Sequence, residues 1–482
     1  MVPALAKLEP EELWKHFDRL AAIPRASSKE AAVREYARGV AAARGLEALE
    51  DSSGNLIVRK PAHPGREGAP TTLLQAHLDM VCEKNDATVH DFDRDSITLV
   101  REGDWLKADG TTLGADNGIG VAAALAVMES TNVNHGPLEF VFTTEEETGL
   151  TGAAQFAAGV LKAKYYLNLD NEETETLCIG CAGGLNTTAR RKVKLVPAAG
   201  DSGWRIKVSG LHGGHSGVDI HQGRGNAIRI LGALLRDLLE RLPVELADVN
   251  GGSAHNAIPR EAVALVGLPY NRENEMKSIA AAAEAAAKAE LGRFDSGLQI
   301  NIARAELPAN VMDADSAKNI AAVLASLPQG ILAMSPDVPG LVQTSTNLAT
   351  LSTAGDVVTI GTSQRSAIAS SKESAARLVA TVCRLGGFEV EHSGSYPGWK
   401  PEPGSDLVQK LQAAHQKLFG QPAKLIAMHA GLECGVIGEK YPGMQIISLG
   451  PTIVDPHSPN ERVQISTVGD FWKFLKLALE TL

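Results

Sequence analysis

Apolar residues in the first part of the chain change from a helical spacing to short continuous runs. Leu13, Phe17 and Leu20 recur at helical spacing within residues 9–43, where we expect two helices. An alanine-rich helical stretch follows at residues 117–130. Apolar runs of strand length occupy residues 54–61, 71–81, 137–145 and 164–170. Strands that alternate with helices predict an α/β fold with a doubly wound, mostly parallel sheet.

The pattern changes from about residue 184 onward. Strand-like runs become frequent there, at residues 186–196, 204–210 and 262–268. A long alanine-rich helix is predicted at residues 276–291, and a Pro- and Gly-rich linker follows near residue 395. A helix and strands then resume the first pattern. We therefore expect one domain made of residues 1–183 and 396–482, interrupted by an inserted α+β domain at residues 184–395, because surface loops tolerate domain insertion.

The composition indicates a folded protein and argues against two classes of partner. Of the 482 residues, 44% are hydrophobic and 21% are charged, which is ordinary for globular proteins. The 46 Lys and Arg residues against 57 Asp and Glu residues give a net charge of −11. Such a chain repels a nucleic-acid backbone and an anionic membrane surface, so neither is an expected partner.

Three further features favour a cytoplasmic protein. No apolar run approaches the roughly 18 residues that a bilayer-spanning helix needs. The amino-terminal segment becomes amphipathic and acidic at once, unlike a signal peptide. Five cysteines are few, and odd in number, for a secreted disulfide framework.

Metal-capable side chains follow predicted strands in five segments. They are His77, Asp116, the acidic triplet Glu145, Glu146 and Glu147, Asp170, and His457. The ligand crevice of an open α/β sheet lies outside the carboxyl ends of its strands, so these segments can converge. Each one alone has a simpler interpretation, such as a helix N-cap for Asp116, a turn residue for Asp170 or a solvated loop for the triplet.

Together, two imidazoles and three carboxylates form a ligand set that divalent ions such as zinc accept. If one carboxylate bridges, each of two metals receives three protein ligands. A metal pair roughly 3.5–4 Å apart lowers the pKa of bound water from 15.7 towards about 7 and polarises a carbonyl. The five segments therefore predict a hydrolase.

The same segments carry a family resemblance. The motifs HLDMV at 77–81, GADNG at 114–118, the EExG motif that ends at Gly149 and PHSP at 456–459 resemble the di-zinc exopeptidases and deacylases related to aminoacylase and carboxypeptidase G. Within that clan, the chain resembles the aminoacyl-histidine dipeptidases through GCAGG at 180–184, GGHSG at 213–217, HAGLECG at 429–435 and GPTIVDPHSP at 450–459. The resemblance covers nearly the whole chain.

The resemblance implies a metal site in which Asp116 bridges two ions. His77 and Asp170 complete the ligand set of one ion, and Glu147 and His457 complete that of the other. The ions are expected to be zinc, although manganese and cobalt accept the same ligands.

The resemblance also implies two further roles beside the metals. Glu146 is the implied general base, and Asp79 is implied to orient the His77 imidazole. Counting back from Gly149 assigns Glu146 and Glu147 to the EE pair. Glu145 is a third acid where a neutral residue is expected, so a register shifted by one residue stays open.

The inserted domain is implied to close as a lid and to bind substrate. His215 in GGHSG would support the oxyanion, Asn256 would contact substrate, and Arg365 would bind the free carboxylate. His255 stands where the family leads us to expect an arginine. The alternative interpretations are a surface-loop histidine and a surface-strand arginine. Glu433 in HAGLECG is a candidate ligand for the substrate amine or a structural residue.

Two other motifs carry no function in this interpretation. The GDSG at residues 200–203 is similar to a serine-protease signature but has no partner motifs. Cys178 and Cys181 form one C-x-x-C motif without the second pair of a structural zinc site, so we expect them to be structural or incidental.

The leading hypothesis is a cytosolic di-zinc dipeptidase that hydrolyses Xaa-His dipeptides such as carnosine, active as a homodimer on small peptides. A broader aminopeptidase or an N-acyl amino acid deacylase of the same clan is the main alternative. A metal-binding protein without turnover is disfavoured, because such a protein has no need of the base Glu146.

Overall fold

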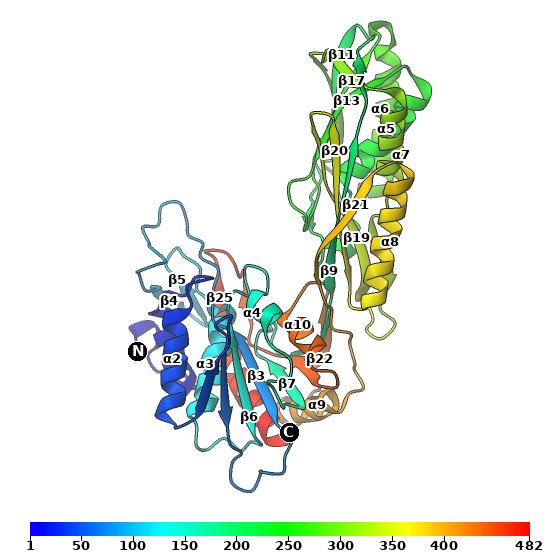
Figure 1. Cartoon of the computed structure of the whole chain (residues 1–482). Helices are drawn as coiled ribbons and strands as arrows, with labels where there is room; N and C mark the ends of the chain where they lie inside the picture. Colours follow the sequence, from blue (N-terminus) through cyan, green and yellow to red (C-terminus); the bar gives the residue numbers. More distant parts are fainter. The chain divides into compact units, whose positions relative to one another are not determined.

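The computed structural model describes residues 1–482 and divides into two compact units (Figure 1). The first unit comprises Met1–Gly180, Trp399–Ala427 and Leu432–Leu482. The second unit comprises Cys181–Gly398 and the short segment Met428–Gly431. In sequence, the second unit is thus inserted into the first.

The first unit contains helices and strands in alternation. Its helices are η1 (Pro3–Leu5), α1 (Glu11–Ala21), α2 (Ala31–Ala43), α3 (Ala115–Glu129), α4 (Thr151–Gln155), α9 (Asp406–Phe419), α10 (Glu433–Glu439) and α11 (Ile465–Thr481). Its strands are β1 (Glu47–Glu50), β2 (Leu56–Lys60), β3 (Thr72–His77), β4 (Leu99–Glu102), β5 (Trp105–Ala108), β6 (Leu138–Thr143), β7 (Tyr165–Asn168), β8 (Thr176–Cys181), β22 (Lys424–Met428), β23 (Gln445–Ser448), β24 (Ile453–Val454) and β25 (Arg462–Gln464).

Eight of these strands form one sheet in the order β1-β2-β6-β3-β7-β23-β8-β22. The central strands β6, β3, β7 and β23 are parallel, as the apolar runs predict. Strands β1, β2 and β8 pair antiparallel toward the edges, so the sheet is mixed. The expected α/β class is confirmed, and its parallel part is the centre of the sheet.

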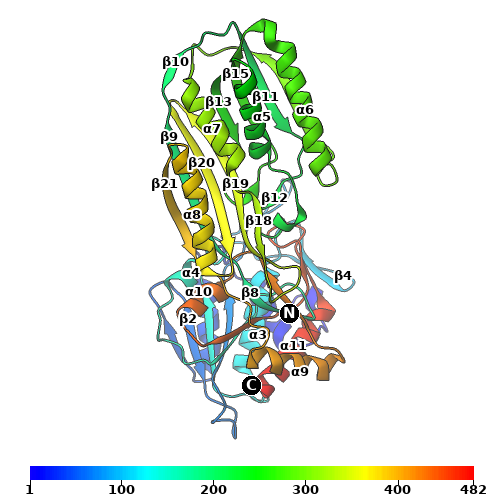
Figure 2. The ribbon, with the colours of Figure 1, turned by 90° about the vertical axis from the view of Figure 1, so that its right-hand side faces the viewer.

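Buried side chains hold helices against this sheet. Helix α3 packs on β3, and α1 and α2 pack on α3. All but three residues of α3 are buried apolar or glycine residues, so this helix is apolar on every side, as expected of a helix enclosed by others. Another apolar cluster joins the sheet to residues of α4 and α10, and it includes Ile57, Leu73, Val141 and Tyr166. Figure 2 shows α9 and α11 side by side.

A smaller sheet of four short strands, in the order β24-β25-β5-β4, lies beside the main one in the first unit. It positions the loop that contains His457, because this loop connects β24 to β25. Arg462 pairs with Lys107 and Val463 with Leu106 in this sheet. The strands have two to four residues each, which is too short for a clear hydrophobic pattern in the sequence.

The second unit contains fewer, longer elements. Its strands are β9 (Gly183–Lys192), β10 (Leu195–Pro197), β11 (Ser202–Ser209), β12 (Gly214–His215), β13 (Glu245–Gly251), β14 (Ala257–Ile258), β15 (Ala262–Leu268), β16 (Gln299–Ala305), β17 (Asn310–Met312), β18 (Gly330–Met334), β19 (Val342–Ala354), β20 (Val357–Ser366) and β21 (Glu389–Tyr396). Its helices are η2 (Ile220–Gln222), α5 (Ala227–Arg241), η3 (Tyr270–Arg272), α6 (Glu273–Leu291), α7 (Ala314–Ser326) and α8 (Ala369–Leu385).

Helices α5 to α8 lie on one face of a nine-stranded sheet in the second unit (Figure 2). The sheet is antiparallel at the pairs β11–β15, β19–β20 and β20–β9. Its core includes Trp204, Leu231, Leu235 and Ile320, which are at most 1% exposed. This segregation of helices and antiparallel strands agrees with the expected α+β character.

None of the helices combines the length and the apolar character that a bilayer-spanning segment requires.

Candidate metal and catalytic site

Three of the parallel strands bring candidate residues to one edge of the main sheet. His77 is the last residue of β3 and is 1% exposed. The acidic triplet follows β6 after one further residue, and Asp170 lies two residues beyond the end of β7. Because His77 pairs in register with Thr143 of β6, these chain segments leave the sheet at the same level.

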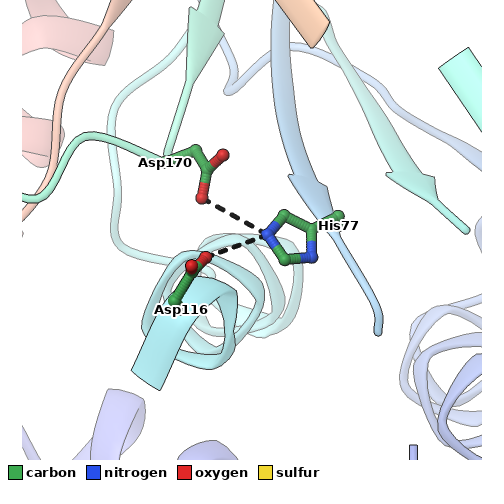
Figure 3. Close-up of side chains that lie close together, drawn as sticks. All are labelled: His77, Asp116 and Asp170. Carbon is green, nitrogen blue, oxygen red and sulfur yellow. Dashed lines mark hydrogen bonds and ion pairs between the residues drawn. The ribbon is translucent and has the colours of Figure 1, made fainter. Parts of the chain in front are cut away.

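Asp116 approaches this edge from helix α3. The N-cap of α3 is Gly114, and the Asp116 side chain does not cap the helix, which excludes the simpler interpretation of this residue. Instead, Oδ1 of Asp116 lies 3.0 Å from Nε2 of His77. Oδ1 of Asp170 lies 3.5 Å from the same nitrogen, so three side chains converge on one point (Figure 3).

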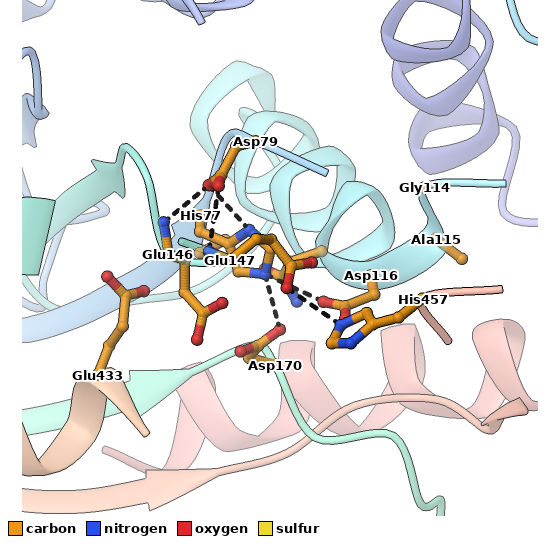
Figure 4. Close-up of polar contacts among 12 residues, drawn as sticks. His77, Asp79, Gly114, Ala115, Asp116, Glu146, Glu147, Asp170, Glu433 and His457 are labelled. Atoms are coloured by element: carbon orange, nitrogen blue, oxygen red, sulfur yellow. Dashed lines mark hydrogen bonds and ion pairs between the residues drawn. The ribbon is translucent and has the colours of Figure 1, made fainter. Parts of the chain in front are cut away.

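The other oxygen of Asp116 faces a second histidine. Oδ2 of Asp116 lies 3.0 Å from Nε2 of His457, and Oε2 of Glu147 lies 3.0 Å from the same nitrogen (Figure 4). Candidate ligand atoms lie within 4.8 Å of one another in three groups: His77, Asp116 and Asp170; Asp116, Glu147 and His457; and His77, Glu146 and Glu147. Asp116 therefore offers one oxygen to each of two adjoining sites.

The charges of these groups fit divalent cations. Burial disfavours the charged imidazolium of His77, yet Asp170 and Asp116 raise its pKa well above the ordinary value. Hydrogen bonds that His457 donates to Asp116 and Glu147 raise the pKa of its imidazole to about 11. Burial raises the pKa of Asp170 to about 6. In the metal-free protein, protons bound by these groups therefore offset the negative charge of the clustered carboxylates.

The polar atoms also fit a metal pair. Oε1 of Glu147 is buried and has no hydrogen-bond partner. Imidazole nitrogens and carboxylate oxygens are the donors that zinc and similar ions select. The residues present therefore suit two divalent ions that share Asp116.

Glu146 shares the third group with His77 and Glu147, and its carboxylate makes no hydrogen bond to the other candidate ligands (Figure 4). Burial raises its pKa well above the ordinary value, and the negative charges of Asp170 and Glu433 act in the same direction, while His77 opposes them. A carboxyl group with a raised pKa at such a site is suited to proton transfer near neutral pH.

Asp79 holds the acidic triplet against β3. Its carboxylate is fully buried and accepts hydrogen bonds from the backbone N–H groups of Glu146 and Glu147, both at 3.1 Å. Burial raises its pKa, but the His77 imidazole nearby and hydrogen bonds from Ser27 and Glu146 outweigh burial and lower it to about 2. The backbone N–H of Glu145 instead donates to Glu30, and Glu145 is in none of the three ligand groups.

Glu433, the first residue of α10, is 2% exposed and faces Glu146 (Figure 4). Its Oε2 accepts hydrogen bonds from Nε2 of Gln75 at 2.6 Å and from Oγ1 of Thr143 at 2.8 Å. Its Oε1 is buried without a partner. Burial raises its pKa to about 7, although His77 opposes this shift.

The remaining candidates, His215, Asn256 and Arg365, belong to the second unit. Nδ1 of His215 accepts hydrogen bonds from the backbone N–H groups of Gly217 and Val218, at 3.2 and 3.1 Å. The ring proton is therefore on Nε2, which is free to donate. Burial and the positive charge of Arg365 lower the pKa of His215, so the neutral ring is favoured.

Arg365 lies on β20, is 7% exposed and donates from Nη1 to the hydroxyl of Tyr396 at 2.9 Å. Its Nε has no partner. Its burial and its hydrogen bond to Tyr396 do not fit the alternative of an exposed surface arginine. Asn256 is exposed, and its backbone carbonyl accepts a hydrogen bond from the N–H of Ser216 at 2.7 Å.

The GDSG segment and the C-x-x-C motif, which have no assigned function, lie among buried structural contacts. Ser202 of the GDSG segment donates from its hydroxyl to the backbone carbonyl of Leu268 and accepts a hydrogen bond from the Trp204 indole. Cys178 and Cys181 lie on β8 and are both 1% exposed.

Four charged residues near the site were not anticipated from the sequence. They are Arg25, Glu30, Glu172 and Glu461. Burial and the charge of Asp116 raise the pKa of Glu172 to about 8. Only Glu172 and Glu461 offered a signal, because each lies within four residues of a predicted ligand. Arg25 and Glu30 lie in a loop far from every motif.

Comparison with known proteins identifies the family of the chain. Residues 73–481 match peptidase family M20/M25/M40. The chain is 38% identical over 480 residues, 99% of both chains, to the cytosol non-specific dipeptidase of Escherichia coli strain K12.

Two solved structures extend the comparison. The aminoacylhistidine dipeptidase of Vibrio alginolyticus matches with a TM-score of 0.93 and 38% identity, covering 99% of this chain and 98% of that one. The aminopeptidase PepT of Bacillus cereus, 18% identical with a TM-score of 0.58 over 98% of this chain and 99% of that one, shares the fold. The resemblance to aminoacyl-histidine dipeptidases is thus confirmed. The chain belongs to peptidase family M20/M25/M40 and is a metallopeptidase, a hydrolase that acts on peptide bonds.

Proposed function

We propose that this protein is a dipeptidase that hydrolyses Xaa-His dipeptides, of the carnosine type and related ones, with two divalent metal ions. The observation that carries the proposal is the position of Asp116, which presents Oδ1 to His77 and Oδ2 to His457, each at 3.0 Å. The names of the relatives from Escherichia coli and Vibrio alginolyticus support dipeptide substrates.

Each ion would have three protein ligands. His77, Asp116 and Asp170 would hold one, and Asp116, Glu147 and His457 would hold the other. Zinc is the proposed metal, and manganese or cobalt would suit the same donors. When bound, the ions would supply positive charge that acidifies water and polarises the scissile carbonyl.

The proton transfers fall to Glu146 in this proposal. Its carboxylate accepts a proton from the attacking water and then donates it to the leaving amine, as its raised pKa allows. Asp79 faces Nδ1 of His77 at 3.3 Å and keeps Nε2 of that ring directed at the carboxylates.

Substrate recognition is proposed for residues of both units. In the second unit, Nε2–H of His215 donates to the carbonyl oxygen in the transition state, Arg365 pairs with the free carboxylate and Asn256 contacts the peptide. In the first unit, Glu433 binds the substrate amine through its unpartnered oxygen.

The wider organisation is also part of the proposal. Residues 1–183 and 396–482 form the catalytic domain, and residues 184–395 form a lid that also mediates homodimer formation. We place the enzyme in the cytoplasm, which agrees with the name of the Escherichia coli relative. Its substrates are small peptides.

A broader dipeptidase specificity is the second candidate, because that relative is named non-specific. A panel on metal-reconstituted protein separates the two: Xaa-His dipeptides, matched dipeptides without histidine, their N-acetyl forms, and tripeptides. We expect the highest kcat/KM on Xaa-His dipeptides with a free amine. Equal rates without histidine would establish the broader specificity, and faster N-acetyl cleavage would indicate a deacylase.

A further inference from the structure

The loop at the start of α3, residues 113–116, is held by a buried carboxylate from a distant part of the chain. Glu461 is 2% exposed. Its Oε2 accepts hydrogen bonds from the backbone N–H groups of Leu113 at 2.7 Å and Gly114 at 2.9 Å. Its Oε1 accepts from those of Ala115 at 2.7 Å and Asp116 at 3.2 Å. One side chain thus satisfies four consecutive backbone donors.

These donors would otherwise be unsatisfied. The first N–H groups of a helix have no partner within it, and a side chain at the N-cap usually accepts from them. The N-cap here is Gly114, which has no side chain. The backbone at Asp116 and Asn117 departs from helical dihedral angles, so these N–H groups precede the regular part of α3, and the Glu461 carboxylate accepts from them through both oxygens.

The same loop is held from its carbonyl side by a buried cation. Arg25 is 3% exposed, and its Nη2 donates to the backbone carbonyl of Gly114. Its Nη1 donates to the carbonyls of Leu78 at 3.0 Å and Asp79 at 2.8 Å. Arg25 therefore connects the loop that begins α3 to the segment directly after His77.

The close fit of Arg25 depends on two glycines. A Cβ atom added at Gly114 would lie 2.5 Å from Nη2 of Arg25, and one added at Gly118 would lie 2.8 Å from the same atom. The backbone at both residues is therefore open enough for the guanidinium to lie directly against it. Figure 4 shows that Gly114 and Ala115 lead directly into Asp116.

Glu461 also lies four residues after His457, in the loop between β24 and β25. It therefore ties the loop of His457 to the loop of Asp116, while Arg25 ties the loop of Asp116 to that of His77. We propose that Arg25 and Glu461 are positioning residues that together fix these three loops, so that each oxygen of Asp116 faces its own histidine. This inference rests on the proposed metal site, to which it adds a pair of residues that contact no ligand atom.

Stability alone does not account for this pair. Buried charges often stabilise a fold no more than well-packed apolar residues of similar volume. The hydrogen bonds of Arg25 and Glu461 reach only backbone groups next to candidate ligands. Their removal should therefore weaken metal binding in addition to any loss of stability.

The test measures binding of Zn²⁺ and Co²⁺ alone to metal-free full-length protein. Glu461→Gln keeps the size of the side chain but turns an NH2 group toward backbone N–H donors. We expect both dissociation constants to rise about 10- to 100-fold, the usual effect of changing a group that orients ligands. The absorption spectrum of bound Co²⁺ should change as well. Glu480→Gln, which changes an exposed carboxylate on α11, is the matched control and should bind like the wild type.

Folding is checked separately by circular dichroism and urea unfolding of each metal-free variant. Arg25→Lys and Glu461→Asp keep the charges and provide folded variants if Glu461→Gln does not fold. We expect both to weaken metal binding, and Glu461→Asp to weaken it less than Glu461→Gln. Wild-type affinity and Co²⁺ spectrum in any folded Glu461 variant would overturn the inference. If the wild type itself binds no divalent ion, the proposed function fails instead.

Discussion

Nδ1 of His77 lies 3.3 Å from Oδ1 of Asp79, so the other ring nitrogen of His77 faces the carboxylates of the site. The carboxylate of Asp79 also accepts hydrogen bonds from the backbone N–H groups of Glu146 and Glu147. One buried carboxylate thus sets both the orientation of a candidate ligand and the register of the acidic triplet. Orientation by such a partner is common among metal-bound histidines.

The first prediction separates the base from the ligand within the triplet. Glu146→Gln should keep the metal content and lose most turnover, because a carboxamide cannot accept a proton from water. Glu147→Gln should lose metal as well, because Oε2 of Glu147 faces His457. Metal analysis and kcat on the same preparations check this. Glu145→Gln is the control and should resemble the wild type; exchanged phenotypes would mean that the register is shifted by one residue.

The second prediction concerns His215. Its Nδ1 is occupied by two backbone donors, so only Nε2–H can reach a substrate oxygen. His215→Ala should lower kcat about 10²–10³-fold with a smaller change in KM, because an oxyanion donor acts mainly in the transition state. His221→Ala, which removes an exposed imidazole in the same region, should have little effect. An effect on KM alone would assign His215 to ground-state binding.

The third prediction tests the carboxylate clamp. Removing one partner of a buried charge pair costs about 2–5 kcal/mol, so Arg365→Met should lower kcat/KM on a Xaa-His dipeptide roughly 30- to several-thousandfold. Amidation of the dipeptide should harm the wild type similarly and the variant little further. Arg384→Met, an exposed change on α8, is the control. If the wild type cleaves acid and amide equally, Arg365 is not the clamp.

The fourth prediction uses the pKa of Glu433, which burial raises from 4.5 to about 7. Between these values the folded protein binds a proton that the unfolded chain releases, so stability falls as the pH rises through this window. The full penalty, about 3 kcal/mol for a shift of this size, is present above pH 7. Glu433→Gln removes it.

Urea unfolding of metal-free protein checks the expected sign. Glu433→Gln should be more stable than the wild type at about pH 8 and nearly equal to it at about pH 5. Glu480→Gln should show no such dependence on pH. A stability difference that is the same at both pH values would show that Glu433 is ionised throughout.

Much of the site could be predicted because its residues follow strands. His77 ends a short apolar run, Glu147 and Asp170 follow such runs within four residues, and parallel strands deliver their carboxyl ends to one edge. The helix of Asp116 is predicted by its composition, since residues 117–130 are rich in alanine and other apolar residues. These are local patterns that a single sequence displays.

Arg25, Glu30 and Glu461 could not be predicted in this way. They lie in loops without hydrophobic periodicity, and their partners are backbone groups rather than recognisable side chains. Glu461 is 346 residues away from Ala115, to which it binds. The antiparallel direction of strands toward the edges of the main sheet could not be predicted either, because it depends on which strands pair.

The central claim is that Asp116 is shared by two metal ions, and metal stoichiometry tests it most directly. Wild-type protein dialysed against Zn²⁺ should hold two ions per chain, Asp170→Ala about one, and Asp116→Ala neither at wild-type affinity. Asp86→Ala, which removes an exposed carboxylate, should hold two. Loss of both sites on removal of Asp116 is the result that the account predicts. One fully occupied site of wild-type affinity in Asp116→Ala would contradict it.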